Sequence, residues 1–202
     1  MILKQIDKIK FTIITTVLEV TKDCFYKLHL FICLCIFLVA CNSNTSTNKN
    51  VFTYNESTGI ATLDPAFAKN QSIIWAVHQL YNTLVEVDTS LNIVPSIAKY
   101  WNVSDDRKTY TFYLRDNVFF HDNTAFENGK GRKLVASDIV YSLNRIIDAK
   151  TASSGAWIFN NRVDKVQPFI ALNDTVFQVK LLKPFHPILG ILTMQYCSIV
   201  PK

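Results

Sequence analysis

Residues 101–115 read WNVSDDRKTYTFYLR, and this stretch decides the fold class. Two runs rich in aromatic and apolar residues, 101–103 and 109–114, are separated by a polar cluster, which is the pattern of a β-hairpin. In the second run every other residue is large and apolar, so one face of this strand should be buried in an antiparallel sheet. These residues are Tyr110, Phe112 and Leu114.

The residues after the hairpin predict a helix. Residues 118–121 have an extended character, and a polar, glycine-bearing loop occupies 122–134. Residues 138–147 then read DIVYSLNRII, with apolar side chains at the spacing of one helical face. Strands and helices are therefore mixed, and we expect an α/β protein in which residues 85–185 form a small α+β subdomain.

Weaker patterns predict the remaining elements. Ser72 is a typical N-cap, and the residues after it predict an amphipathic helix. Pro95 is expected to open a short helical turn at 96–100. The other expected elements are strands at 51–55, 84–87, 163–166, 175–181 and 197–200 and a helix at 185–194.

An apolar run at 28–40, LHLFICLCIFLVA, precedes a cysteine and a polar tract. Its 13 residues are too few to cross a bilayer core, which needs roughly 20. A charged stretch, a short apolar stretch and a small residue before the cleavage point are typical of a secretory signal peptide. We therefore expect a leader at 1–40 and a polar tether at 41–50. The junction L-V-A-C resembles a bacterial lipobox, which implies lipid on Cys41; the alternative is an ordinary apolar core helix that contains a cysteine.

Composition argues against several classes of function. The chain has 21 lysines and arginines against 16 acidic residues, a mild excess without the basic patch that nucleic-acid binding needs. The histidines lie far apart, no cysteine pair has the spacing of zinc ligands, and no nucleophile motif is present. We therefore expect no nucleic-acid partner, no metal, no cofactor and no enzymatic activity.

Several short motifs follow one another along the chain. They are L-D-P at 63–65, A-K-Y-W at 98–101, Y-T-F-Y-L-R at 110–115, V-F-F-H-D at 118–122 and V-A-S-D-I-V-Y-S-L-N-R at 135–145. By these motifs the chain resembles the extracytoplasmic solute-binding proteins of ABC importers, specifically the oligopeptide/dipeptide-binding family. The resemblance covers residues 51–202, which is almost everything after the leader and the tether.

The resemblance implies a periplasmic-binding-protein-like fold, of which residues 51–202 would be the first lobe only, truncated before the second lobe. It implies a monomer that captures oligopeptides or dipeptides without chemistry and delivers them to the membrane permease of an ABC transporter. The protein would be exported and lipid-anchored to the cell envelope membrane, facing the periplasm or the cell exterior. Two alternatives stay open: a same-family binder of a nickel chelate, haem or sugar, and a non-transport lipoprotein that acts as an adhesin or assembly factor.

The resemblance also places ligand contacts in two loops, one before the helix that follows Ser72 and one after the helix at 138–147. The alternative interpretation is that these loops only connect elements of the scaffold. Because a binding cleft needs two walls, we expect the chain alone to bind peptide weakly. The expected contact residues are Lys69, Asn70 and Gln71 in the first loop and Ser154, Gly155 and Trp157 in the second.

Overall fold

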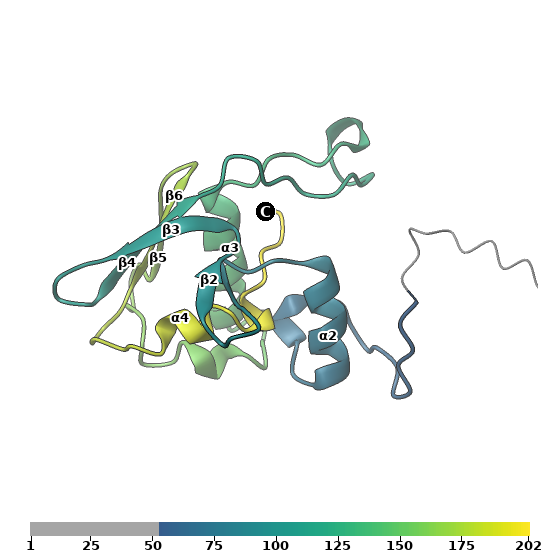
Figure 1. Ribbon diagram of the computed structural model, residues 1–202, viewed down its shortest axis with the longest axis horizontal. Coiled ribbons are helices and arrows are strands. Elements are labelled where there is room, and N and C mark those ends of the chain that lie inside the picture. The colour runs from purple at the N-terminus through teal and green to yellow at the C-terminus, as the bar shows by residue number, and fades with distance from the viewer. Residues whose placement is uncertain (1–52) are drawn as a thin grey trace, which may run out of the picture. The chain divides into compact units, whose positions relative to one another are not determined.

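In the computed structural model, which describes residues 53–202, the main sheet is four-stranded and antiparallel, with the strand order β3-β4-β6-β5 (Figure 1). Hairpins join β3 to β4 and β5 to β6, and β4 pairs with β6 in the middle of the sheet. This sheet and the helices around it confirm the expected mixture of strands and helices. The strands are β3 (Ala98–Val103), β4 (Thr109–Leu114), β5 (Phe169–Asn173) and β6 (Val176–Lys180).

The predicted hairpin forms, and it supplies much of the core. Trp101 of β3 pairs with Phe112 of β4, and the turn between the strands is polar as expected. On β4 every other side chain from Tyr110 to Leu114 is buried. Phe112 lies opposite Phe177 of β6, with the ring centroids 6.2 Å apart. Burial with a period of two is what a strand with one face on the core requires.

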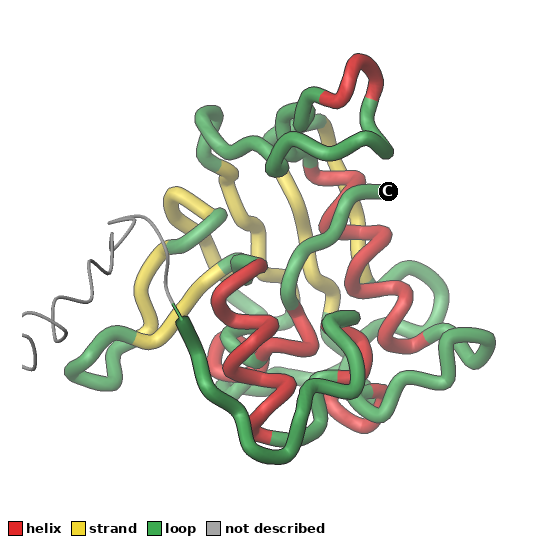
Figure 2. Tube along the Cα trace, turned by 90° about the vertical axis from the view of Figure 1, so that its right-hand side faces the viewer, coloured by secondary structure: helices red, strands yellow, loops and turns green. Residues whose placement is uncertain are grey.

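Helix α3 (Ala136–Ile147) packs on β5 and β6 and covers one face of the sheet (Figures 1 and 2). It begins two residues before the predicted start, with Val135 at the N-cap position. The Asp138 carboxylate accepts a hydrogen bond from the Val135 amide at 3.0 Å. This is one of the two hydrogen bonds of a capping box; the other needs an oxygen on the N-cap side chain, which valine lacks. Ile139, Leu143 and Ile146 are fully buried, whereas Val140 and Ile147 are half-buried.

Helix α2 (Gln71–Leu80) is followed by a two-stranded antiparallel sheet of β1 (Val85–Val87) and β2 (Ile93–Pro95). The prediction that Ser72 caps α2 is wrong. Asn70 is the N-cap, and its Oδ1 accepts a hydrogen bond from the Ile73 amide at 3.0 Å. Both residue types are good caps, and Asn70 takes the role because its backbone is the last extended one before the helix.

The helical turn predicted at 96–100 does not form, and these residues lead into β3. Ala98 is already paired with Leu114. The Ala98 amide donates to the Leu84 carbonyl at 2.9 Å, so a neighbouring segment provides the partner that a helical turn would have provided locally. Pairing between strands therefore decides the conformation here.

The prediction of a strand at 163–166 is also wrong. Val163 makes only an isolated bridge to Leu181, and the strand at this edge of the sheet is β5. Phe169 of β5 is buried against Phe159, with the ring centroids 5.1 Å apart in an edge-to-face arrangement. Burial of this large ring explains why β5, rather than the segment before it, joins the sheet.

The strand predicted at 197–200 is replaced by a 3-10 helix (Gln195–Cys197) and an extended tail. In this tail, residues 198–202, the Ile199 amide donates to the Asn82 carbonyl at 3.0 Å. The tail runs beside α3 toward the residues that follow β4 (Figures 1 and 2). Before it lies helix α4 (Ile188–Ile191), a shorter helix than the one predicted at 185–194.

Residues 119–133 form an arm that extends away from the sheet (Figure 1). A single bridge joins Phe119 to Lys133 at its base. The two sides of the arm approach so closely that a Cβ on Gly131 would lie 1.8 Å from the carbonyl oxygen of Phe120. Only glycine allows this approach without a shift of the backbone.

The predicted leader at 1–40, the lipid site at Cys41 and the tether lie outside the described residues. Of the strand predicted at 51–55, the described residues 53–55 are irregular. Helices of the described part are all too short or too polar to span a bilayer. Residues 55–202 form one compact unit, and the separate subdomain at 85–185 stays a prediction.

Candidate functional site

The first predicted ligand segment, residues 69–71, lies at the end of a longer loop, residues 64–71, called here the first loop. This loop contains a 3-10 helix (Pro65–Phe67), and its last residue, Gln71, begins α2. The Asp64 carboxylate accepts a hydrogen bond from the Ala66 amide at 3.0 Å and so caps this turn. Arg145, in the last turn of α3, donates two further hydrogen bonds to the same carboxylate, of 3.1 and 2.6 Å. The first loop is therefore anchored to the helix that covers the sheet.

The ion pair between Asp64 and Arg145 fixes the charge of both groups. Partial burial raises the pKa of the Asp64 carboxyl, but hydrogen bonds from Arg145 and the Ala66 amide outweigh this effect, and the net pKa is lowered. The pKa of Arg145 is raised, mainly by its hydrogen bond to Asp64. The anchor of the first loop consequently consists of charge-assisted hydrogen bonds at neutral pH.

The second predicted ligand segment, residues 153–157, lies within a longer loop that follows α3, residues 151–162, called here the second loop. It overlaps a 3-10 turn (Ala156–Ile158). Nη1 of Arg162 donates to two carbonyl groups of this turn, at 2.7 and 3.0 Å. The guanidinium lies over the ring of Phe185, 5.2 Å from its centroid. The turn therefore presents the indole of Trp157, which is 55% exposed, on a backbone that Arg162 holds in place.

The fold brings the two loops together. The hydroxyl of Ser153 donates to the Ala66 carbonyl at 2.5 Å, joining residues 87 positions apart, and accepts a hydrogen bond from the Gly155 amide at 3.0 Å. The 3-10 helix that contains Tyr196 lies against the turn of the first loop. The hydroxyl of Tyr196 also lies 3.3 Å from the hydroxyl of Ser154, which belongs to the second loop. Segments far apart in sequence are thus in direct contact.

The six predicted ligand residues differ in what the structure leaves available. Asn70 uses its side-chain oxygen to cap α2. Gly155 packs against Tyr196 so closely that a Cβ would lie 2.5 Å from the tyrosine ring. Asn70 and the other four are exposed, and the Ser154 hydroxyl also lies 3.3 Å from the Tyr196 hydroxyl. That the six residues contact ligand stays a prediction. The other four are Lys69, Gln71, Ser154 and Trp157.

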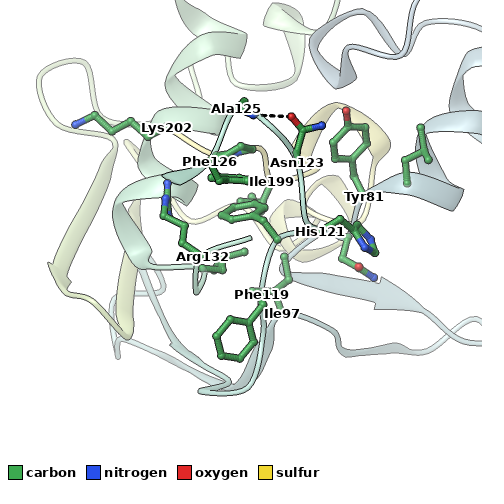
Figure 3. Close-up of a pocket in the computed structure, with 15 residues that line it drawn as sticks. Tyr81, Ile97, Phe119, His121, Asn123, Ala125, Phe126, Arg132, Ile199 and Lys202 are labelled. Atoms are coloured by element: carbon green, nitrogen blue, oxygen red, sulfur yellow. Dashed lines mark hydrogen bonds between the residues drawn. The ribbon is translucent and has the colours of Figure 1, made fainter. Parts of the chain in front are cut away.

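A groove of about 710 Å³ lies at a different place, between the arm, the C-terminal end of α2 and the C-terminal tail (Figure 3). Its lining is largely apolar and aromatic, and it contains none of the six predicted ligand residues. The sequence patterns did not reveal it because its walls come from four separate segments, 80–82, Ile97, 119–134 and 199–202. Its lining includes Tyr81, Phe119, Phe120, His121, Phe126 and Arg132.

Asp138 fixes one wall of this groove. Its fully buried carboxylate accepts hydrogen bonds from Arg132 at 2.8 and 2.5 Å and from the amides of Val135 and Lys202, both at 3.0 Å. Burial raises the pKa of Asp138, but these hydrogen bonds outweigh it, Arg132 foremost, and the net pKa is lowered. Arg132 also lies over the Phe120 ring, 5.2 Å from its centroid. The arm, α3 and the tail therefore meet at one carboxylate.

No three histidine, cysteine or acidic side chains within residues 53–202 gather in a way that would hold a metal ion. Nδ1 of His78 lies 3.0 Å from the side-chain nitrogen of Gln195, and Nε2 of His186 lies 3.3 Å from Nη1 of Arg107. Each of these two histidines links segments that are distant in sequence. Cys197 is fully buried, and burial raises the pKa of its thiol.

Some residues that hold the candidate site had a signal in the sequence, and others had none. Asp64 and Arg145 lie in two of the quoted motifs and carry opposite charges, so their pairing was open to inference. Tyr196 and Arg162 belong to no motif. Their roles depend on partners in segments that the fold brings to them, so a local pattern does not reveal them.

Comparisons with known proteins agree with the motifs. The family model described as bacterial extracellular solute-binding proteins, family 5 Middle, matches residues 92–202. The dipeptide-binding protein of Escherichia coli (strain K12) is 34% identical over 131 residues, which cover 61% of this chain and 24% of that protein. The heme-binding protein A of Haemophilus influenzae is 28% identical over 185 residues, which cover 81% of this chain and 34% of that protein.

A solved structure shares the fold. The ABC transporter-associated periplasmic binding protein DppA of Helicobacter pylori, in complex with the peptide STSA, superimposes with a TM-score of 0.63 at 27% identity. The likeness covers 71% of this chain and 29% of that chain, so the present chain spans about a quarter to a third of the relatives it matches. The family model covers more than half of the chain, and the solved structure agrees with it in fold. The chain belongs to family 5 of the bacterial extracellular solute-binding proteins.

Proposed function

We propose that the chain forms one wall of a peptide-binding site in the substrate-binding protein of an ABC importer. The observation that carries this proposal is the likeness in fold and sequence to DppA of Helicobacter pylori, whose structure contains a bound peptide. The chain spans only 24% of the dipeptide-binding protein of Escherichia coli. The activity, the ligand and the permease partner of a whole receptor are therefore all part of the proposal.

The proposed mechanism is capture without chemical change. An extended peptide offers backbone N–H and C=O groups that bind regardless of its sequence, while its side chains enter roomy pockets. The first loop would contribute the polar side chains of Lys69 and Gln71, and the second loop the flat indole of Trp157. Because both loops are anchored before the ligand arrives, little conformational entropy would be lost on binding.

An NMR titration of the chain with a pool of short peptides tests this proposal. We expect shifts of the amides in residues 69–71 and 153–158, with weak affinity because one wall makes fewer contacts than a cleft closed around its ligand. Replacing Trp157 with alanine should weaken binding by about threefold to tenfold, the value of one aromatic contact. Leu91→Ala, at a turn residue that is 83% exposed, is the matched control and should change nothing. Absence of shifts in both loops at millimolar peptide would contradict the proposal.

We further propose that the protein is exported and lipid-anchored at Cys41. The family consists of extracellular proteins, and the apolar run before the cysteine has the length of a signal peptide rather than a membrane span. A lipid on the first residue after the leader would keep the protein near a permease, although one acyl chain alone binds a membrane only weakly.

Metabolic labelling with a fatty-acid analogue tests the anchor. The wild-type protein should incorporate the label, and Cys41→Ala should not. Cys197→Ala is the matched control, because the thiol of Cys197 is buried and should carry no lipid. Equal labelling of the wild type and Cys41→Ala would show that the lipid is elsewhere or absent.

A further inference from the structure

We propose that Ser153 is a positioning residue that couples the two ligand loops, so that they respond to a bound peptide as one surface. The inference rests on the proposed function, because these loops are the segments expected to contact the peptide. Its basis is one buried hydroxyl group with a hydrogen-bond partner on each loop.

Ser153 is 7% exposed, and its hydroxyl donates one hydrogen bond and accepts another. Its hydroxyl proton goes to the carbonyl of Ala66, at 2.5 Å, in the first loop. Its oxygen accepts from the amide of Gly155, at 3.0 Å, in the second loop. A serine hydroxyl has one proton and two lone pairs, so both bonds form at once. Without it, a carbonyl and an amide would lose this partner in a site with little access to water.

Each loop also has an anchor besides Ser153. The first loop is held through the Asp64 carboxylate, to which Arg145 donates two hydrogen bonds. The second loop is held by Arg162, which donates to two carbonyls of its turn. These anchors restrain each loop apart from the Ser153 bridge, so we expect a displacement of one loop to pass through Ser153 to the other.

The coupling predicts that ligand contacts on the two loops are cooperative. In a double-mutant cycle on peptide affinity, the effects of Lys69→Ala and Trp157→Ala should depart from additivity by about twofold to fivefold. In a Ser153→Ala background the same two substitutions should become additive. A serine with a merely structural role would lower the affinity without changing the additivity, so this readout separates the two roles.

Hydrogen exchange of the ligand-free chain tests the coupling independently of any peptide. In the wild-type protein the amides of Ala68 and Gly155 should open with the same free energy and the same urea dependence. Ser153→Ala should speed exchange in both loops by about threefold to tenfold and leave β4 unchanged. Ser142→Ala is the matched control. Ser142 is another buried serine whose hydroxyl bridges distant segments, but it bonds to Val200 in the tail.

Independent opening of the two loops in the wild-type chain would overturn the coupling, and this measurement decides the matter even if Ser153→Ala does not fold. Faster exchange in only one loop of Ser153→Ala, or equal effects of Ser153→Ala and Ser142→Ala on both loops, would also overturn it. If the loops open together but the wild-type chain binds no peptide, the coupling is supported while the proposed function fails.

Discussion

The two ends of helix α3 are each held by an arginine–aspartate pair, and the pairs differ in burial. At the N-terminal end the Asp138 side chain is completely buried, whereas its partner Arg132 is 39% exposed. At the other end Asp64 and Arg145 are both partly exposed, at 31% and 24%. The first pair joins α3 to the arm and the tail, and the second joins α3 to the first ligand loop.

The difference in burial shows that an arginine–aspartate pair can either stabilise the fold or position a loop. A buried carboxylate is tolerated only when donors replace the water it has lost, and Asp138 has Arg132 and two backbone amides for this purpose. Asp64 needs fewer donors because it keeps contact with water. Its pair therefore positions a loop, whereas Asp138 holds the fold at the junction of three segments.

The largest expected effect concerns the sheet on which both ends of α3 depend. Phe112→Ala should lower the free energy of unfolding by about 3–5 kcal/mol, because the ring is fully buried and its removal leaves a cavity. Urea unfolding measures the change. Phe119→Ala is the control: this ring on the arm is 60% exposed, and its loss should cost less than about 0.5 kcal/mol. Equal effects of the two substitutions would refute the assigned core.

The next largest effect should come from the buried end of α3. Asp138→Ala should destabilise the protein by about 3 kcal/mol, because Arg132 and two amides lose their common acceptor. Thermal and urea unfolding measure it, with Asp105→Ala as the control because Asp105 lies on the exposed hairpin turn. A loss as small as that of the control would mean that the junction of arm, helix and tail does not depend on this carboxylate.

A smaller effect is expected at the exposed end. Asp64→Ala should cost about 1–2 kcal/mol, from the lost cap on the first loop and a partly screened ion pair. High salt should reduce this cost markedly, whereas it should alter the Asp138→Ala effect little, because buried pairs are screened less. The comparison between the ends of α3 breaks down if both variants respond equally to salt.

Acid should weaken both ends of α3. A carboxyl whose folded pKa lies below its unfolded value, about 3.9, contributes stability that is complete above that value and is lost as the pH falls through the folded pKa. The pKa values of Asp64 and Asp138 are both lowered, so the free energy of unfolding should fall below about pH 4. Asp64→Asn and Asp138→Asn should each flatten this acid loss. Ser142→Ala, which removes no ionisable group, should lower the whole curve in urea unfolding without changing its slope.

The resemblance to the family pointed to the two loops, and their contact with ligand stays a prediction. The structure adds that the loops are joined through Ser153. Sequence alone did not distinguish the residues that stay available from those with a structural task, since Asn70 caps a helix and Gly155 accommodates Tyr196. That distinction depends on neighbours from other segments.

The sequence by itself determined those elements in which apolar residues recur with the regular spacing of a strand or a helix. The alternation in residues 109–114 and the helical spacing in 138–147 require only that one side of each element meets a core. The strand forms as predicted, and the helix forms with a start two residues earlier. Tertiary structure decided whether residues 96–100 turn or extend, and whether residues 163–166 or β5 complete the sheet. It also decided that Asp138 meets Lys202 across 64 residues. These outcomes depend on hydrogen-bond partners and buried contacts supplied by distant segments, and the periodicity of a single segment contains no information about them.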